Sequence, residues 1–254
     1  MGDPERSAQR IFGRRASGYV SSRTHANKST LRKLVALARP QRQARVLDIA
    51  TGAGHTAFAF APFVSGVIAV DITREMIDEA RRLQDRNGLR NVDFALAAAA
   101  ELPFADQAFD IVTCRRAAHH FSDIRGALGE MNRVLAIGGR LIIDDRSVPE
   151  DDFVDATMNE LDTLHDESHV REYRPREWVS MLEEARFKVD AVSTHSKQRP
   201  LSSLSADVAP DRVARINAII RTLDAEQRLA MNVAEKQGQV FTNHWFVMVA
   251  ATRI

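Results

Sequence analysis

Two glycines and two acidic residues between positions 48 and 71 have the types and spacing expected of a nucleoside-binding turn. Gly52 and Gly54 come after an apolar run that contains Asp48, and a second apolar run, 67–70, ends abruptly on Asp71. A charge at the end of a buried strand needs a partner, and open α/β sheets bind ligands at that end of their strands. One carboxylate can accept hydrogen bonds from both hydroxyls of a ribose. The pattern therefore predicts a pocket for a nucleoside-type ligand.

The same turn fits a second interpretation. Residues 52–57, GAGHTA, match the G-x-G-x-x-A fingerprint of dinucleotide-binding proteins, in which a diphosphate binds at the N-terminus of the following helix. The protein would then be an NAD(P)-dependent oxidoreductase. Asp48 within the first strand disfavours this, and we find no obvious Tyr and Lys or Cys and His set for hydride transfer. An ordinary tight turn with Asp71 as a capping residue is the simplest alternative.

Four of the eight histidines lie in patterns that could do chemistry. His119 and His120 follow the fourth expected strand, where an imidazole would suit a general base acting at neutral pH. Packing of one ring and a backbone hydrogen bond to the other is the competing interpretation. His165 and His169 share a helix face as in H-E-x-x-H zinc sites, but Asp166 replaces the Glu and no third ligand is evident. We expect no metal, and we expect these two histidines beside the acceptor instead.

Alternating strands and helices must position these groups. The expected strands are 45–50, 66–71, 92–96, 109–114 and 140–144, and the helices between them are 54–63, 74–87 and 123–135. This alternation predicts a parallel sheet with right-handed crossovers. Helices at 7–20 and 25–39 precede it. The chain after the sheet should form helices at 150–166 and 174–185, a strand at 187–192, a continuous or broken helical stretch at 211–236, and an apolar strand at 241–252.

Length and composition limit the class of protein. The chain has 254 residues, 44% of them hydrophobic, which suffices for one large α/β domain or two small ones. No apolar run approaches the roughly 20 residues of a membrane span, and no signal-peptide core begins the chain. The single cysteine, Cys114, excludes an internal disulfide. We expect a soluble cytoplasmic protein with no membrane partner.

The net charge of +1 conceals an uneven distribution. Residues 1–45 contain eleven basic and two acidic residues, a charge of +9 (11 − 2), so the remainder carries −8 (24 − 32). A basic arm for nucleic acid, as in an RNA-modifying protein, is one interpretation. A helical cap lying on an acidic body is favoured, because an apolar face runs along the second helix through Leu31, Leu34, Val35 and Leu37.

Several blocks together resemble the class I S-adenosylmethionine-dependent methyltransferases. They are V-L-D-I-A-T-G-A-G at 46–54, V-D and T-x-x-M-I within 70–77, E-L-P-F-x-x-x-x-F-D-I-V at 101–112, H-H-F-x-D at 119–123 and R-V-L-x-x-G-G-R-L-I-I at 133–143. The resemblance covers roughly residues 10 to 190. It is strongest to the quinone-biosynthesis-like, methyltransferase type 11/25-like branch, whose members act on small molecules.

The resemblance implies a Rossmann-like, doubly wound α/β fold. We expect a seven-stranded sheet with an antiparallel last strand, an N-terminal helical cap and a helical insertion after the fifth strand. The chain should form a single methyltransferase domain with a cap (1–40), a cofactor-binding core (41–146), acceptor-side helices with the sixth strand (147–240) and the last strand (241–254). A homodimer is the candidate assembly.

The implied activity is methyl transfer from S-adenosyl-L-methionine to a small organic acceptor, at oxygen, nitrogen or carbon. A member of the same fold that binds the cofactor but performs a rearrangement or cyclisation is an open alternative. An RNA-modifying role is disfavoured, because no N/D-P-P-Y/F motif follows the fourth expected strand.

The resemblance also assigns residues by position. Gly52 and Gly54 would line the methionine part of the cofactor, Asp71 would hold the ribose, and Asp48 would orient the turn. Ala98 stands where many members have an Asp that contacts adenine, so that contact should come from the backbone of 98–100, from Glu101, or be absent. The other expected cofactor residues are Tyr19, Ile72, Met76, Ala98, Ala99, Ala100 and Arg115. At the acceptor we expect two catalytic residues, His119 and His120. We expect the acceptor pocket to be lined by His25, His165, His169 and Tyr173.

Overall fold

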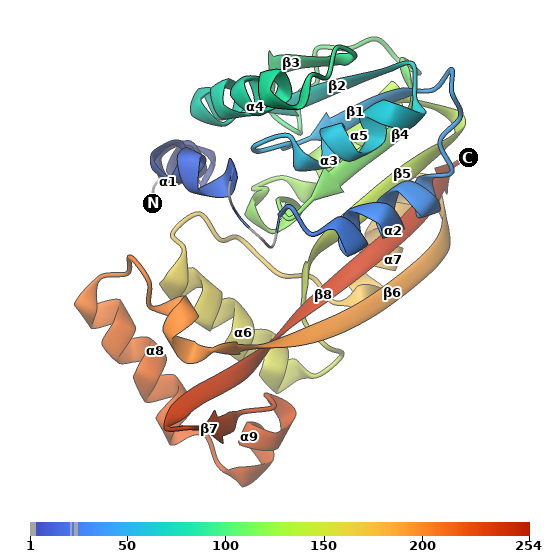
Figure 1. The fold of residues 1–254 in the computed structure, drawn as a ribbon. Helices are drawn as coiled ribbons and strands as arrows, with labels where there is room; N and C mark the ends of the chain where they lie inside the picture. The colour runs from blue at the N-terminus through green and yellow to red at the C-terminus, as the bar shows by residue number, and fades with distance from the viewer. Residues whose placement is uncertain (1–3, 21, 23–24) are drawn as a thin grey trace.

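A mixed β-sheet forms the centre of the computed structural model, which describes residues 4–20, 22 and 25–254. Residues 1–3, 21 and 23–24 of the expected cap lie outside the described residues. The strand order is β3-β2-β1-β4-β5-β8-β6, and β8 runs antiparallel between β5 and β6 (Figure 1). This confirms the predicted seven-stranded arrangement. The strands are β1 (Arg45–Ile49), β2 (Gly66–Asp71), β3 (Val92–Leu96), β4 (Phe109–Arg115), β5 (Leu135–Ser147), β6 (Phe187–Pro200) and β8 (Gln239–Arg253).

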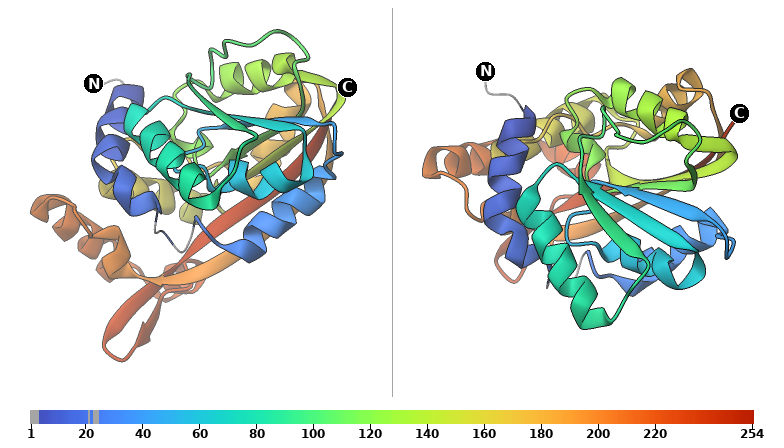
Figure 2. Two further views of the ribbon diagram at one scale, coloured as in Figure 1. Left: turned by 45° about the horizontal axis from the view of Figure 1, so that its top comes forward. Right: turned by 90° about the horizontal axis from the view of Figure 1, so that it is seen from above.

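Helices cover both faces of this sheet, as Figure 2 shows. On one face lie α2 (Lys28–Ala38), α3 (His55–Phe60) and α4 (Arg74–Asn87); on the other lie α5 (Ile124–Val134) and α7 (Pro175–Glu184). Separate hydrophobic clusters fill the two sides, one around Leu34 and Phe60 and the other around Leu128 and Trp178. The first helix, α1 (Pro4–Val20), packs against α4, so the predicted N-terminal helical cap is present.

Local sequence explains where several helices begin and end. The side chain of Asn27 accepts a hydrogen bond from Thr30 N–H at the start of α2, and Asp123 accepts one from Gly126 N–H at the start of α5. Gly88 ends α4 in the left-handed conformation, with φ 65°. These caps agree with the sequence-based helix boundaries within a few residues.

The last two long strands extend further than the sequence predicted. β6 and β8 continue past the parallel strands as a two-stranded antiparallel ribbon (Figure 1). Helices α6 (Asp152–His165), α8 (Pro210–Thr222) and α9 (Ala225–Ala230) accompany the ribbon. The third hydrophobic cluster lies here and includes Met158, Leu204, Ile216 and Met231.

The helical prediction for 211–236 is wrong at its end. The stretch breaks into α8 and α9, and then forms a short strand, β7 (Ala234–Lys236), that pairs with β8. The two residues between these strands, Gln237 and Gly238, have φ of 52° and 72°. Positive φ at both positions is the geometry of a tight hairpin turn whose twist matches that of the paired strands. The hairpin therefore prevents the helix from reaching residue 236.

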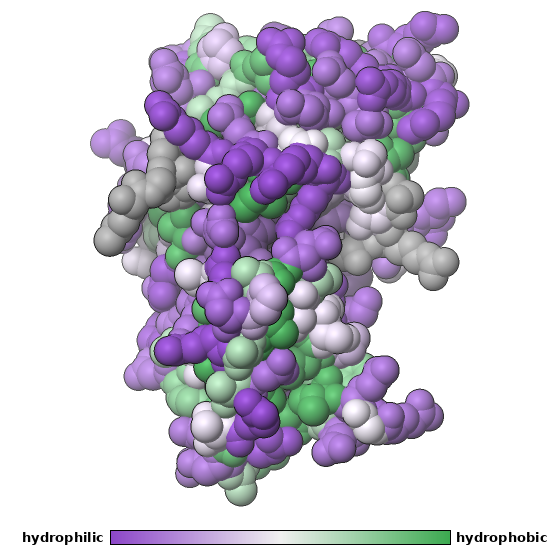
Figure 3. Space-filling view, turned by 90° about the vertical axis from the view of Figure 1, so that its left-hand side faces the viewer, coloured by the Kyte–Doolittle hydropathy of each residue, from purple (hydrophilic) through white to green (hydrophobic). Residues whose placement is uncertain are grey.

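Within the described part of the chain, no helix has both the length and the apolar character needed to cross a membrane. Figure 3 shows the side of the molecule that lies at the left in Figure 1. Hydrophilic side chains dominate the upper half of this face, and apolar side chains are more frequent in the lower half.

Candidate functional site

A cavity opens at the carboxyl ends of the parallel strands, beneath α1. It encloses about 840 Å³ of space, a volume that includes open solvent at its mouth. Of the residues expected at the site, the cavity wall contains Tyr19, Gly52, Asp71, Ile72, Met76, Ala98, Ala99, Ala100 and His120. Sequence reasoning missed Glu5, Ala8, Phe12, Ile49, Ala50, Thr73, Ala97, Arg116, Ala117, Phe121, Asp123 and Ala127. The i, i+4 spacing of Ala8 and Phe12 on α1 is a signal that could have identified part of this set.

The two glycines of the turn have different roles. Gly52 has φ 54° and lines the cavity, and a Cβ built there would meet nothing within 4 Å. The backbone at this point is therefore open to close approach by a ligand. Gly54 has φ 86°, and its Cβ would lie 2.6 Å from Cζ of Phe58. Gly54 thus serves the packing of the turn against α3 and does not line the cavity.

Asp48 lies beneath the turn, with 1% of its surface exposed. Its Oδ2 accepts hydrogen bonds from Thr51 Oγ1 at 2.6 Å and from Ala57 N–H at 3.2 Å, and its Oδ1 accepts one from Thr113 Oγ1 at 2.6 Å. Burial raises the pKa of Asp48 to about 6, although these hydrogen bonds oppose the shift. The carboxylate connects β1, the turn, α3 and β4, which is a suitable geometry for orienting the turn.

Asp71 reaches the cavity from the end of β2. Its Oδ2 accepts a hydrogen bond from Gly52 N–H at 2.8 Å, and its Oδ1 accepts one from Thr73 N–H at 2.9 Å. Burial raises the pKa of this carboxyl. Because a carboxylate has about four lone-pair sites, each oxygen can accept one more hydrogen bond from a ligand hydroxyl. The arrangement fits a ribose diol.

The wall at the end of β3 is apolar. Ala97 to Ala100 line the cavity, whereas Glu101 is exposed and does not. Ala98 and Glu101 form an isolated bridge, with Glu101 N–H donating to Ala98 O at 3.2 Å. An adenine would therefore meet small side chains and backbone here. Together with Gly52 and Asp71, this wall fits the nucleoside part of S-adenosylmethionine.

The two arginines at the end of β4 point in different directions. Arg115, expected at the cofactor, is buried and does not line the cavity; its Nε donates to Thr56 Oγ1 at 2.9 Å and its Nη2 donates to His25 O at 2.6 Å. It therefore joins the cap to α3. Arg116 has φ 57°, an unusual left-handed conformation for a non-glycine residue, and it lines the cavity.

His119 and His120 form part of a short 3-10 helix, η2 (Ala118–His120). Nδ1 of His119 lies 2.6 Å from Oδ1 of Asp145, and its backbone N–H donates to Oδ2 of the same carboxyl at 3.2 Å. His120 instead donates from Nδ1 to Ser168 O at 3.0 Å, and its ring packs edge-on against Phe12 at 5.0 Å. Burial, with a contribution from His119, lowers the pKa of His120 to about 3.

The cap residues Tyr19 and His25 lie together, with ring centroids 4.8 Å apart. Tyr19 lines the cavity, and its carbonyl accepts a hydrogen bond from His55 Nε2 at 3.1 Å. His25 does not line the cavity, and its Nδ1 lies 2.8 Å from Ser22 Oγ. Burial raises the pKa of Tyr19 to about 12 and lowers the pKa of His25 to about 3. Both rings are therefore neutral at pH 7.

The remaining expected acceptor residues lie beyond the cavity wall. His165 Nδ1 donates to Leu204 O at 3.0 Å, and His169 Nε2 lies 3.0 Å from Asn159 Oδ1, with its ring centroid 6.1 Å from that of His119. Tyr173 packs against Trp178 at 5.6 Å. Among the described residues, no group of three or more His, Cys, Asp or Glu side chains could hold a metal ion.

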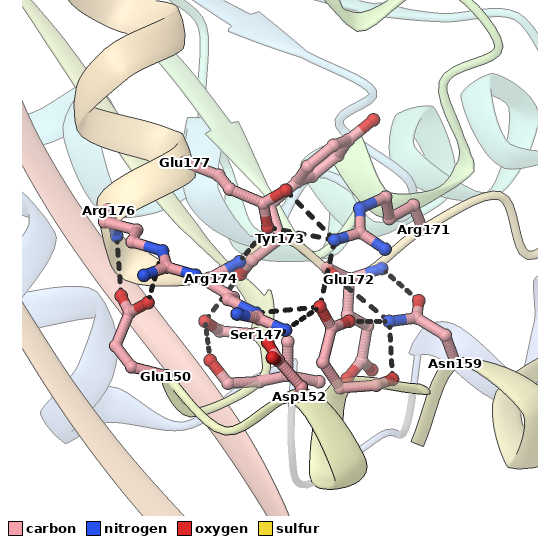
Figure 4. Close-up of polar contacts among 12 residues, drawn as sticks. Ser147, Glu150, Asp152, Asn159, Arg171, Glu172, Tyr173, Arg174, Arg176 and Glu177 are labelled. Atoms are coloured by element: carbon pink, nitrogen blue, oxygen red, sulfur yellow. Dashed lines mark hydrogen bonds and ion pairs between the residues drawn. The ribbon is translucent and has the colours of Figure 1, made fainter. Parts of the chain in front are cut away.

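Figure 4 shows the polar network around Tyr173. The guanidinium carbon of Arg171 lies 5.7 Å from the centroid of the Tyr173 ring. Asp155 accepts from both Arg171 and Arg174 at 3.1 Å and 2.7 Å. Arg171 also pairs with Glu177 at 3.0 Å. These contacts hold the 171–177 segment in place. A role for Tyr173 at the acceptor stays a prediction.

Comparison with known proteins agrees with this geometry. Residues 40–238 match a family model described as a methyltransferase domain. The chain is 44% identical over 171 residues to the uncharacterized methyltransferase YcgJ of Bacillus subtilis, covering 67% of this chain and 68% of that protein. It is 29% identical over 184 residues to the ubiquinone/menaquinone biosynthesis C-methyltransferase UbiE of Pectobacterium atrosepticum, covering 70% of each. The crystal structure of YcgJ superposes with a TM-score of 0.83 and 34% identity, covering 89% of this chain and 98% of that chain.

Proposed function

The chain belongs to the class I S-adenosylmethionine-dependent methyltransferases, and on that premise we propose that it methylates a small organic acceptor bound next to the α1 cap. S-adenosylmethionine, when bound, supplies a methyl group on a sulfonium that is already activated for in-line displacement. The chain's contribution is then to hold and align the two reactants. The observation that carries this proposal is the cavity bounded by Gly52, Asp71 and the rings of Phe12 and Tyr19.

The residues divide the binding work between polar and apolar groups. The carboxylate of Asp71, held by two backbone N–H groups, would accept hydrogen bonds from ribose hydroxyls. The open backbone at Gly52 would allow the methionine part to approach closely. Phe12 and Tyr19 of α1 would exclude water, and a neutral phenol ring near a sulfonium is a favourable cation–π neighbour.

His119 is the general base we assign for acceptors that must lose a proton. With Asp145 at Nδ1, the imidazole is held in one orientation, and its Nε2 has no hydrogen-bond partner among the described residues. Burial tends to raise the pKa of Asp145, but the charge of His119 and the hydrogen bond from it hold the pKa below its usual value. His120 is less suited, because its low pKa makes it a weak base.

Binding and label transfer test the proposal. Cofactor-stripped protein should bind S-adenosylhomocysteine in isothermal titration and should transfer label from methyl-labelled S-adenosylmethionine to members of a panel of phenols, amines and enolisable carbonyl compounds. Absence of binding would overturn the proposal. Conversion of an acceptor without transfer of label would instead support rearrangement or cyclisation chemistry.

The assignment of His119 has its own test. His119→Gln should lower kcat by about 10²- to 10⁴-fold, the usual contribution of a general base, with little change in cofactor affinity. Asp145→Asn removes the carboxylate that orients the imidazole, so kcat should also fall in this variant while cofactor affinity stays unchanged. An unchanged kcat in Asp145→Asn would contradict the role given to the pair.

A further inference from the structure

Arg116, a residue of the cavity wall, has unused hydrogen-bond donors. Its Nε donates to Asp144 Oδ2 at 3.2 Å, but its two Nη nitrogens have no hydrogen-bond partner among the described residues. The guanidinium carbon lies 3.8 Å from the ring centroid of Phe246 on β8. This stacking and the hydrogen bond to Asp144 hold the guanidinium against β8 and β5. Two of its three nitrogens therefore remain available to a ligand.

Arg199 supplies a second guanidinium from the ribbon. It is partly buried near the end of β6, and among the described residues its side chain has neither an ion pair nor a hydrogen bond. In the register of β6 and β8, Arg199 pairs with Thr242 and His195 pairs with Phe246. Alternate residues of a strand share a face, so Arg199 lies on the same face of the ribbon as Phe246 and the guanidinium stacked on it.

The two arginines lie along the same stretch of β8, because Thr242, the partner of Arg199, precedes by four residues the Phe246 on which the guanidinium of Arg116 stacks. Burial, followed by the charges of Arg146 and Arg116, lowers the pKa of Arg199. Burial, with the charges of Arg115, Arg116 and Arg199, also lowers the pKa of His25 in the cap. Positive charge therefore gathers where the cap, the end of β4 and the ribbon meet.

The nearby carboxylates are already engaged. Asp144 pairs with Arg116, Asp145 is bound by His119, and Asp162 pairs with Arg146 at 2.6 Å. Glu172 also contacts Arg146, and burial raises its pKa well above the usual value. No carboxylate among the described residues lies in ion-pair distance of Arg199. The N–H donors of the Arg199 guanidinium therefore have no acceptor among the described residues, and an anion from outside the chain would supply one.

From this arrangement we propose that the methyl acceptor carries a carboxylate or phosphate group, which Arg116 and Arg199 bind together. Planar guanidinium groups suit both anions, because they donate parallel hydrogen bonds to two oxygens. Anchoring the anion on β4 and the ribbon would leave the rest of the acceptor near His119 and the cavity. The inference rests on the proposed methyltransferase function.

Isothermal titration on protein saturated with S-adenosylhomocysteine tests the proposal without knowledge of the acceptor. The probes are benzoate, phenyl phosphate and the neutral benzamide. At least one anion should bind, and benzamide should bind at least about tenfold more weakly. Arg199→Gln should weaken binding of the anion by about tenfold to a hundredfold and leave the affinity for S-adenosylhomocysteine unchanged. The preferred anion distinguishes a carboxylate from a phosphate.

A matched control and a cofactor comparison complete the experiment. Lys188→Gln removes the same charge from an exposed position at the other end of β6 and should not affect anion binding. Binding of S-adenosylhomocysteine and of 5′-methylthioadenosine, which lacks the carboxylate, is compared in Arg116→Gln. If Arg116→Gln weakened binding of S-adenosylhomocysteine but not of 5′-methylthioadenosine, Arg116 would bind the cofactor's own carboxylate. That result would overturn the role of Arg116 at the acceptor.

The failing outcomes are distinct. Equal affinity for benzamide and the anions, no binding of either anion, or unchanged anion binding in Arg199→Gln would overturn the proposal. Failure of S-adenosylhomocysteine to bind the wild-type protein would instead contradict the methyltransferase function on which the proposal rests.

Discussion

Replacement of Asp71 by asparagine should weaken cofactor binding more than it destabilises the fold. In the free protein the two carboxylate oxygens accept hydrogen bonds from Gly52 N–H and Thr73 N–H. Asparagine keeps one oxygen and places an NH₂ group against the other N–H. One buried donor is then left without an acceptor, which costs about 1–3 kcal/mol. Because burial raises the pKa of Asp71, loss of the charge recovers part of its desolvation cost. The free energy of unfolding should therefore fall by an amount near the lower limit.

The effect on binding follows from the charge of the lost acceptor. A hydrogen bond to a charged group contributes about 1.5–3 kcal/mol, and 1.4 kcal/mol corresponds to a factor of ten in affinity. Asp71→Asn should therefore raise the Kd for S-adenosylhomocysteine by about tenfold to a hundredfold. The same loss is expected for 5′-methylthioadenosine, because both molecules contain the ribose.

Isothermal titration measures the Kd, and urea unfolding measures the stability. Asp93→Asn is the matched control, because it removes the same charge from an exposed position on the neighbouring strand β3. Its Kd should equal that of the wild type. If folded Asp71→Asn protein bound S-adenosylhomocysteine within about twofold of the wild type, the assignment of Asp71 to the ribose would be refuted.

Two further changes test the turn and the cavity wall. Gly54→Ala should lower the free energy of unfolding by about 1–3 kcal/mol, because its Cβ would lie 2.6 Å from Phe58. Gly52→Ala should lower the free energy of unfolding by about 1–2 kcal/mol because of the left-handed backbone. It should also weaken S-adenosylhomocysteine binding, since its Cβ would enter the open space. Equal affinity of the two variants for S-adenosylhomocysteine would contradict the different roles given to the two glycines. The folded pKa of His120 is about 3 and its unfolded value is near 6.5. Between these values the unfolded state binds more protons than the folded state. The free energy of unfolding should therefore decrease as the pH is lowered through this window, by up to about 1.4 kcal/mol per pH unit. His120→Gln should reduce that slope in urea unfolding measured from about pH 6 to about pH 4, and an unchanged slope would contradict the burial of a neutral imidazole.

The central strands and the cofactor turn could be predicted because their signals are local. Apolar runs separated by glycines, caps and helical periodicity specified β1 to β4 and the helices between them within a few residues. The placement of Asp71 at a strand end predicted its position in the cavity, because the carboxyl ends of parallel strands meet at one edge of the sheet.

The extent of the ribbon lay beyond this reasoning. Residues 193–198 of β6 are mostly exposed and polar, so no alternation of apolar side chains marks them as a strand. They form one because their backbone groups pair with β8, a partner more than 40 residues away in sequence. Backbone pairing between distant segments leaves little trace in side-chain types.

By itself the sequence determined the Rossmann-like core, the nucleoside turn and the family, since these depend on residue order over short stretches. Only the tertiary structure decided which of two neighbouring side chains reaches the site. Arg116 and not Arg115 lines the cavity, where β4 ends and the backbone of Arg116 takes φ 57°. Of the two histidines, His120 lines the cavity, whereas His119 lies against Asp145, because β5 brings that carboxyl to one side of η2. Adjacent residues of the same type have nearly the same sequence signal, and long-range packing determines their directions.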